Sequence, residues 1–316
     1  MPRYAGIVDG KLVDLEPGLS TVQIYVNPGA DERKELVERL RLDEHTLASA
    51  LDPDELARVE LEPDHLAIIF KRPTNYSSQD RLSFKVTSIG MFLLRDRLVV
   101  VMRDEGPLFD GRPLVNIQGI QELVLRILSR TVQHFTGHLK VINTVAAEIE
   151  DRIGTSLDNK SLLQMFAIEK SLVYYVNAIH SNGAVIERLK TNAQNPATVG
   201  FQPQQVEFID DLLIENRQCY ELAMIYSNIL ASLMDARASI ISNNLNVMMK
   251  NLNALVIAVA VPSFFAAVGG MSEFSAMVGF EPHWPEAYAL FILAMALLGT
   301  GTFYLIRKTE RMWRGS

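Results

Sequence analysis

The sequence of 316 residues contains a single cysteine, Cys219. One chain can therefore form neither an internal disulfide nor a metal site built from several thiolates. The motifs of several enzyme classes are also missing: there is no Gly-x-x-x-x-Gly-Lys-Ser/Thr loop, no His-Glu-x-x-His and no Gly-x-Ser-x-Gly. From these absences we expect that the protein is not an enzyme and that it carries no covalently bound cofactor.

Basic residues are outnumbered by acidic ones, with 30 Lys and Arg against 37 Asp and Glu and a net charge of −7. No cluster of basic residues interleaved with aromatic residues is present, so we expect no nucleic-acid partner. The acidic balance favours attraction of cations instead. The N-terminus also lacks a charged segment followed by an apolar one, so we expect the first part of the chain to stay in the cytoplasm.

Two stretches near the C-terminus, 251–272 and 287–306, contain no charged residue. Each has about the 20 residues that a helix needs to cross ~30 Å of hydrocarbon. The segment between them contains no Lys or Arg. The basic residues after the second stretch are Arg307, Lys308, Arg311 and Arg314. Because positive charge is enriched on the cytoplasmic side of membrane proteins, we expect both termini in the cytoplasm and a multi-pass protein of the bacterial inner membrane.

The first 200 residues alternate between strand and helix patterns. Short apolar runs predict strands at 4–8, 22–26, 66–71, 82–86, 89–94 and 98–102. Near-helical spacing of apolar residues predicts two short helices between Asp31 and Asp52 and longer helical segments at 120–127, 132–153 and 162–189. Several of the strands are apolar on both faces, which predicts a sheet covered by helices. We therefore expect a cytoplasmic α/β domain with a helical cover at 1–200.

Residues 204–268 contain no glycine and only one proline, Pro262. Read as one helix, this stretch would extend roughly 100 Å at 1.5 Å per residue. We expect a long stalk helix that joins the cytoplasmic domain to two C-terminal transmembrane helices. The expected boundaries are a stalk at 201–250, a transmembrane region at 251–306 (first span 251–270, outer loop 271–286, second span 287–306) and a basic cytoplasmic tail at 307–316.

One face of the stalk and the first span is small and polar over its whole length. Residues taken alternately four and three apart form this seam, which has the spacing of a supercoiled helix without the Leu and Ile of a packed core. The seam consists of Asp235, Ser239, Ser242, Asn246, Met249, Asn253, Val256, Ala260, Ser263, Ala267 and Gly270. We expect the seam to face water and ions; the alternative is that its small residues let helices pack closely. Two spans cannot enclose a pore, so several copies would have to surround an axis.

Several fragments resemble the CorA-type divalent-cation channels, a family that includes the zinc-handling ZntB branch. These fragments are the acidic segment 50–60, Asn246-x-x-Met249-Lys250-x-Leu252, Pro262 with Phe265, and Gly270-Met271. The resemblance spans nearly the whole chain and implies a funnel-shaped homopentamer in a lipid bilayer, with the first spans lining the pore. It also implies that Asn246, Met249 and Leu252 lie on the pore wall, and that Zn²⁺, Mg²⁺ or Co²⁺ are transported or regulatory ions.

The sequence departs from the family's Gly-Met-Asn signature at its third residue, which is Ser272. The resemblance places Gly270, Met271 and Ser272 at the outer mouth, where Glu273 can supply a ring of carboxylates in place of the carboxamide. In the expected outer segment, we expect His283, near Glu281 and Glu286, to meet an incoming ion; the alternative is that His283 is an ordinary loop histidine. The departure favours zinc slightly over magnesium, cobalt or nickel. The spacing from proline to glycine is one residue shorter than usual, so pore positions are defined to within one residue.

Acidic residues outside the spans are candidates for a regulatory or pore-entry cation site. The region 31–64 has twelve carboxylates against five Lys or Arg residues, and Asp210, Asp211 and Asp235 lie on the stalk. The alternative is that these carboxylates form solvated surfaces. His134 and His138, one helical turn apart, can share a zinc ion only with further ligands and are otherwise ordinary helix-surface histidines.

The sequence thus predicts divalent metal cation transport through a homopentameric pore. The alternative function is a membrane-anchored cation sensor or regulatory scaffold that does not transport.

Overall fold

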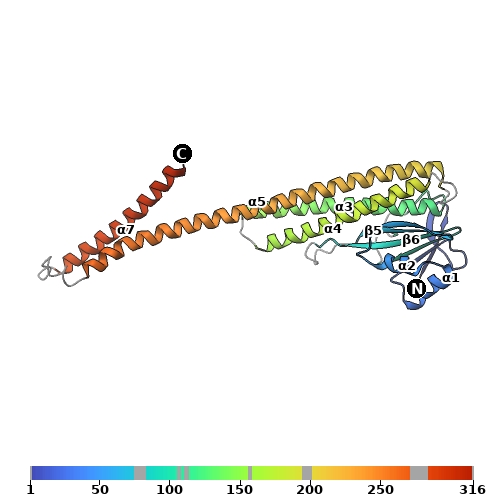
Figure 1. Ribbon diagram of the computed structural model, residues 1–316, viewed down its shortest axis with the longest axis horizontal. Helices are drawn as coiled ribbons and strands as arrows, with labels where there is room; N and C mark the ends of the chain where they lie inside the picture. Colours follow the sequence, from blue (N-terminus) through green and yellow to red (C-terminus); the bar gives the residue numbers. More distant parts are fainter. Residues whose placement is uncertain are drawn as a thin grey trace. The chain divides into compact units, whose positions relative to one another are not determined.

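The structure, a computed structural model, describes residues 2–74, 83–104, 108–109, 114–155, 159–193, 201–270 and 284–314. The chain forms two compact units, Met1–Leu233 and Met234–Ser316, which we call the N-terminal and C-terminal units. The boundary between them lies inside the longest helix, α5 (Pro203–Gly269) (Figure 1). The expected α/β domain, long helix and two C-terminal apolar helices are confirmed.

A seven-stranded sheet forms the centre of the N-terminal unit, with strand order β2-β1-β3-β7-β6-β5-β4. The pair β3 and β7 is parallel, whereas the other neighbours are antiparallel. The strands are β1 (Arg3–Val8), β2 (Lys11–Asp14), β3 (Val22–Val26), β4 (Arg58–Leu61), β5 (His65–Pro73), β6 (Val86–Leu94) and β7 (Leu98–Met102). Every residue of β5 and β7 is buried, as expected for strands that are covered on both faces.

Two strands, β2 and β4, were not expected from the sequence. Both are four residues long and lie at the two edges of the sheet, where most of their residues are exposed or half-buried. Edge strands carry polar side chains, so their apolar pattern is weak. The predicted strand at 82–86 is wrong at Ser83–Lys85, because β6 begins at Val86. The backbone N–H of Phe84 instead donates to the Ser171 hydroxyl, 3.1 Å away.

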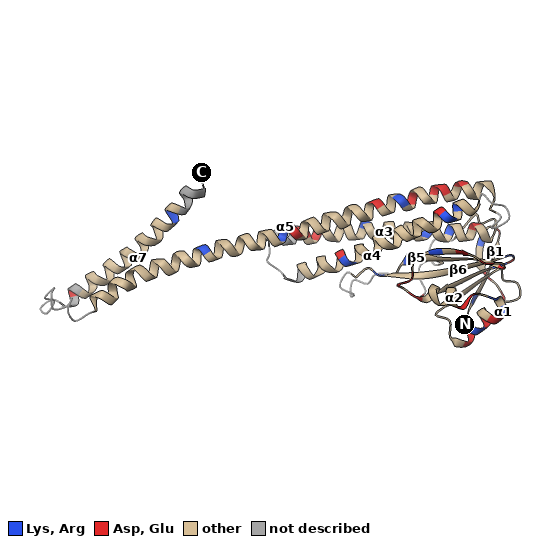
Figure 2. Ribbon diagram, viewed as in Figure 1, with Lys and Arg blue, Asp and Glu red and all other residues tan. Residues whose placement is uncertain are grey.

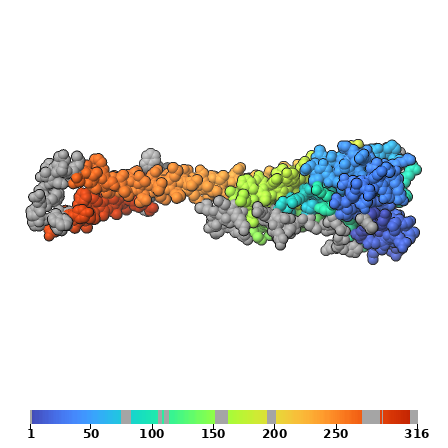
Figure 3. All heavy atoms as spheres, turned by 90° about the horizontal axis from the view of Figure 1, so that it is seen from below, coloured from blue at the N-terminus to red at the C-terminus, as the bar shows by residue number. Residues whose placement is uncertain are grey.

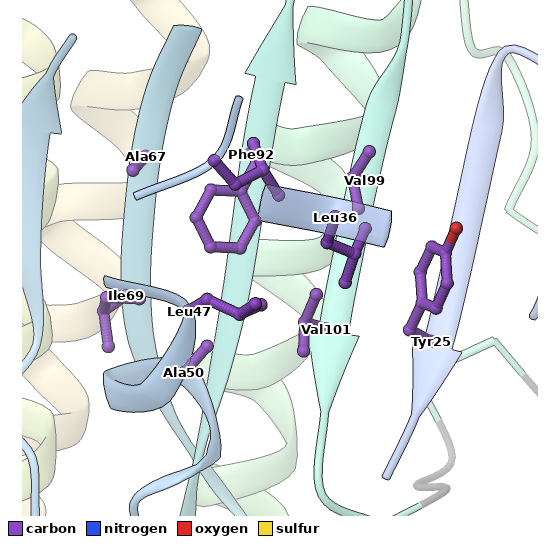
Figure 4. Packing of buried hydrophobic residues seen from close by; sticks show 10 residues of the cluster. Tyr25, Leu36, Leu47, Ala50, Ala67, Ile69, Phe92, Val99 and Val101 are labelled. Carbon is purple, nitrogen blue, oxygen red and sulfur yellow. The ribbon is translucent and has the colours of Figure 1, made fainter. Parts of the chain in front are cut away.

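Two short helices, α1 (Ala30–Leu40) and α2 (Glu44–Leu51), cover one face of the sheet. Figure 4 shows Leu36, Leu47 and Ala50 from these helices packing on side chains of the sheet. A Cβ atom on Gly90 would lie 2.4 Å from the Cβ of Ala50. Glycine at this position of β6 therefore lets α2 approach the sheet closely. In the space-filling view, the blue and teal atoms of the strands and short helices gather into one body (Figure 3).

Two long helices, α3 (Ile120–Thr155) and α4 (Asn159–Ala193), cover the opposite face (Figure 1). The two helical segments predicted at 120–127 and 132–153 are one continuous helix, since the residues between them contain no helix breaker. On α4, the Asn182 side chain accepts from the backbone N–H of Lys71 and donates to its carbonyl, each at 2.8 Å. This amide pairs with the backbone of β5 and ties the helical layer to the sheet.

The first part of α5 packs within the same unit. The Asn216 amide donates to the carbonyl of Ile179 on α4 at 3.0 Å, and the guanidinium of Arg126 on α3 lies over the ring of Phe208. α5 therefore begins by packing against α3 and α4, and it continues without interruption to Gly269.

Candidate functional site

The C-terminal unit contains the end of α5 and the helix α7 (Trp284–Arg314). Both are long and apolar enough to cross a membrane, and each contains an 18-residue window with mean hydropathy 2.1. Figure 2 shows charged residues along α3, α4 and the first part of α5, whereas the last part of α5 is almost free of them. Lys250 is the last charged residue of α5. The candidate first and second spans therefore both have the length and apolar surface that a bilayer requires.

α7 lies alongside the end of α5 in both views of the molecule (Figures 1 and 3). A Cβ atom on Gly299 of α7 would lie 3.2 Å from the carbonyl oxygen of Ala258 and 3.3 Å from Cγ of Pro262. Nearer the C-terminal end of α5, a Cβ on Gly269 would lie 3.2 Å from Cε2 of Phe291. These contacts define an antiparallel pairing and a contact face on α5, formed by Ala254, Ala258, Pro262 and Gly269. Ala254 and Ala258 are only 4% and 7% exposed.

The polar seam lies on the other side of α5. An α-helix turns by about 100° per residue, so the seam between Asn253 and Ala267 is centred roughly 180° around the helix from the contact face. Every member of the seam, from Asp235 to Gly270, is exposed in the single chain, and so is Leu252 on its flank. The structure therefore brings the predicted pore residues onto one open surface that α7 does not cover.

The seam presents oxygen ligands at several heights along the helix. Asn246 and Asn253 are seven residues apart, which is two helical turns or about 10.5 Å along the axis. Within the described part of the chain, neither side chain takes part in a hydrogen bond. The hydroxyl of Ser263 donates to the carbonyl of Val259 at 2.8 Å, which leaves its oxygen free to accept from solvent. Carboxamide and hydroxyl oxygens of this kind suit contact with the water shell of a cation.

Most residues of the predicted outer mouth lie outside the described residues. These are Met271, Ser272, Glu273, Glu281 and His283. Gly270 directly follows α5, and its backbone N–H donates to the carbonyl of Ala266 at 3.0 Å. Glu286 is exposed in the first turn of α7. The described residues of the predicted mouth are thus Gly270, at the end of α5, and the carboxylate of Glu286.

The stalk carboxylates differ in their surroundings. Asp210 forms an ion pair with Lys190 on α4, with 2.7 Å between Oδ1 and Nζ. Asp211 and Asp235 are exposed. In the described ranges of the chain, no three His, Cys, Asp or Glu side chains are placed to hold one metal ion.

The acidic region 31–64 uses several of its carboxylates for local structure. Asp43 caps α2 and accepts from the backbone N–H of Thr46 at 2.8 Å, which holds the pKa of this carboxyl below its usual value. Glu32 accepts from the backbone N–H of Gly29 at 3.0 Å, with the same effect on its pKa. Glu55 and Glu60 both pair with Arg58. These contacts favour a structural role for much of the acidic region.

The histidine pair on α3 is part of the helical layer. The rings of His134 and His138 lie 4.4 Å apart between centroids, and Nδ1 of His138 lies 2.7 Å from the Tyr175 hydroxyl. Burial lowers the pKa of His138 to about 4 and also lowers the pKa of His134. These contacts favour packing in the neutral form over a shared zinc ion. The expectation of an ordinary helix-surface histidine is wrong for His138, which is buried because it packs against Tyr175.

Reasoning from the sequence missed Gly299 and its contact with the carbonyl of Ala258. One signal was available, since small residues in an apolar helix indicate close approach of another helix. Which of the glycines of α7 makes the contact depends on the pairing of the two helices, so the sequence alone does not select Gly299 over Gly301.

Comparisons with known proteins agree with this arrangement. The family described as CorA-like Mg²⁺ transporter protein matches residues 24–308. The cobalt/magnesium transport protein CorA of Methanocaldococcus jannaschii is 25% identical over 282 residues, which cover 84% of this chain and 86% of that protein. The complete structure of the CorA magnesium transporter from Methanocaldococcus jannaschii aligns with a TM-score of 0.76 at 20% identity, covering 97% of this chain and 96% of that chain.

Two further solved structures share the fold at 12% identity. The full-length CmaX protein aligns with a TM-score of 0.67 and covers 97% of both chains. The ZntB cytoplasmic domain from Vibrio parahaemolyticus aligns with a TM-score of 0.59, covering 76% of this chain and 98% of that one.

Proposed function

Because the chain belongs to the family of CorA-like Mg²⁺ transporter proteins, whose members move divalent metal cations across membranes and are not enzymes, we propose that it does so through a pore lined by the seam of α5. The observation that carries this proposal is the position of the seam. It is formed by small and polar residues, is exposed in the single chain and lies on the side of α5 away from α7. A helix in lipid leaves polar side chains exposed only where they meet water, a ligand or another protein surface.

A pore requires several copies of the chain, since the described residues of one copy contain two candidate spans, which cannot enclose a channel. We propose a homopentamer in which each α5 contributes one fifth of the wall and each α7 faces lipid. The α7 surface fits this role, since Leu290, Leu293 and Leu297 are exposed and apolar. The basic residues near the C-terminal end of α7, from Arg307 to Arg314, support cytoplasmic termini and an outer mouth formed by the segment between the spans. In a bacterium this membrane would be the inner one.

The described seam supports passage of a cation that keeps its water shell. Its polar groups are the Asp235 carboxylate followed by carboxamides and hydroxyls, with no thiol and no imidazole from Asp235 to Gly270. Mg²⁺ gives up water reluctantly and suits such recognition, and the curated relative is named for cobalt and magnesium. The slight preference for zinc rests on Ser272 and Glu273, outside the described residues, and stays a prediction. We further propose Asp210, Asp211 and Asp235 as carboxylates that respond to cytoplasmic cations between copies.

The test is a flux assay on the full-length protein reconstituted into vesicles that contain a metal-sensitive dye. Mg²⁺, Co²⁺, Zn²⁺ and Ni²⁺ are compared, each with and without a pH gradient. We expect uptake of at least one of these ions, with an order of rates that identifies the cargo. Absence of flux for all four ions, from a preparation that size-exclusion chromatography with light scattering shows to be pentameric, would contradict the proposal. Metal binding without flux would instead support the sensor function.

A further inference from the structure

A backbone carbonyl of the first span lacks its partner within the helix. In an α-helix each N–H donates to the carbonyl four residues earlier, and Pro262 has no N–H to donate. The carbonyl of Ala258 therefore has no such donor. Pro262 is the one proline inside α5. The missing hydrogen bond to the Ala258 carbonyl therefore lies within the candidate first span.

The backbone of α7 lies against this carbonyl at Gly299. A Cβ atom at that position would lie 3.2 Å from the Ala258 oxygen and 3.3 Å from Cγ of Pro262. Both distances are shorter than ordinary contacts of a Cβ atom, and the oxygen belongs to the backbone, which cannot rotate away. A hydrogen in place of the Cβ leaves room for the carbonyl and permits a weak Cα–H···O contact between the spans.

The contact at Gly299 lies behind the pore wall. Ala258 and Pro262 are on the contact face of α5, and Ala260 and Ser263 occupy the seam at the same height on the opposite side. Any group that pushes the contact face away from α7 therefore moves Ala260 and Ser263 toward the pore axis. In a symmetric ring, the diameter would shrink by twice the displacement of each helix.

We propose that Gly299 is a positioning residue of the transport pathway, which sets the distance between α5 and α7 at Pro262 and thereby the width of the pore at Ala260 and Ser263. The inference rests on the proposed function, since a width matters only if the seam lines a pore. Gly299 itself does not touch the cation.

Two other glycines of the unit differ from Gly299 in what a side chain would meet. At Gly269 the nearest atoms are the end of the Phe291 ring, which can move by rotation of its side chain. At Gly301 no atom lies within 4 Å of a Cβ. Gly301 is on the same helix, two residues from Gly299, and is exposed. It is therefore the matched control for adding a side chain to α7.

The experiment compares Gly299→Ala, Gly299→Val and Gly301→Val in the full-length protein in vesicles, with Mg²⁺ and Co²⁺ as the ions. We expect Gly299→Ala to lower the maximal flux about threefold and Gly299→Val about tenfold, because the neighbouring backbone must shift. The ion concentration that gives half-maximal flux should stay the same, since the residue does not contact the ion. Gly301→Val should transport as the unchanged protein does.

A second substitution distinguishes a narrowed pore from a protein that has lost its structure. Ala260→Gly removes a methyl group from the seam at the narrowed height, without touching Gly299. Combined with Gly299→Ala, it should restore a large part of the lost flux, which a protein damaged by misfolding or failed assembly would not regain. Equal flux in the Gly299 and Gly301 variants, or a loss that Ala260→Gly does not relieve, would overturn the inference while leaving transport by the unchanged protein intact. No flux in the unchanged protein would instead overturn the proposed function.

Discussion

Asparagine has two opposite roles in the two units of this protein. In the N-terminal unit, Asn182 and Asn216 are 0% and 4% exposed and use their amides to bind backbone groups of other elements. In the C-terminal unit, Asn246 and Asn253 are exposed, and the described part of the chain offers them no hydrogen bond. A buried amide must be paired because leaving it unpaired is costly. An exposed amide on an apolar helix is free to meet water or a ligand.

The N-terminal unit also contains a buried charged side chain whose hydrogen-bond partners are other protein groups. Lys71 is buried, and its ammonium donates to the carbonyl of Pro53 at 2.6 Å and to the Ser88 hydroxyl at 3.1 Å. The Ser88 hydroxyl in turn donates to the carbonyl of Asp52 at 2.6 Å. Burial lowers the pKa of Lys71. Its ammonium group is bound by protein oxygens in place of solvent. Substitution of paired polar residues in the N-terminal unit should therefore reduce stability, whereas substitution of the exposed seam residues in the C-terminal unit should reduce flux.

The largest effect is expected for Asn182→Leu in the N-terminal unit. This change leaves the N–H and carbonyl of Lys71 buried and unpaired, at a cost of about 2–5 kcal/mol in the free energy of unfolding. The matched control is Asn177→Leu, which places the same side chain at an exposed position of α4. Chemical unfolding of the detergent-solubilised chain, followed by circular dichroism, measures both. Similar stability of the two variants would show that the amide pairing does not hold the layers together.

Acidification should weaken the N-terminal unit through its buried histidines. The unfolded chain takes up a proton on His138 near pH 6.5, whereas the folded chain does so only at about 4. Stability is therefore fully present above pH 6.5 and is lost as the pH falls toward 4, by about 3 kcal/mol from this group. Burial lowers the pKa of His65 and His134 in the same direction. Unfolding curves measured between pH 7 and pH 4 test this.

His138→Gln should make stability depend less on pH, because one buried histidine is removed. His180→Gln, at an exposed position on α4, is the control and should leave the dependence as it was. A His138 variant with the full pH dependence would assign the effect to other groups.

In the C-terminal unit, Asn253→Leu should reduce flux without reducing stability. In the proposed homopentamer the change removes a ring of carboxamides from the pore wall, and we expect flux to fall about tenfold, since a cation there loses polar contact with the wall. Asn251→Leu is the matched control, because Asn251 is also exposed but lies about 200° around α5 from Asn253. Flux in vesicles and unfolding in detergent are measured on the same preparations. Equal flux in the two variants would place the pore on another face of α5.

The smallest effect is expected for Leu290→Ala on α7. This side chain is 71% exposed and faces lipid in the proposed assembly, so flux should change less than about twofold. The flux assay described above measures it. A large loss would indicate that α7, and not α5 alone, borders the pathway or an essential interface.

Much of the candidate site was predictable because its signals are local. Residues 251–268 carry no charge, and helical spacing groups the seam from Asp235 to Gly270 on one face. The strands of the sheet interior were predictable for the same reason, whereas β2 and β4 were not, because edge strands carry mixed polarity. The ligands of the outer mouth rest on the sequence alone, since Ser272 and Glu273 lie outside the described residues.

By itself, the sequence determined that two helices are apolar over the thickness of a membrane and that one of them carries a continuous polar face. Those properties depend on residues a few positions apart, which the helical repeat brings together in any fold. Only the tertiary structure decided that α7 packs on the side of α5 opposite the seam, with Gly299 against Ala258. It also paired Lys71 with Asn182, 111 residues away. Contacts between such distant residues depend on how whole elements pack, and neither composition nor periodicity encodes that packing.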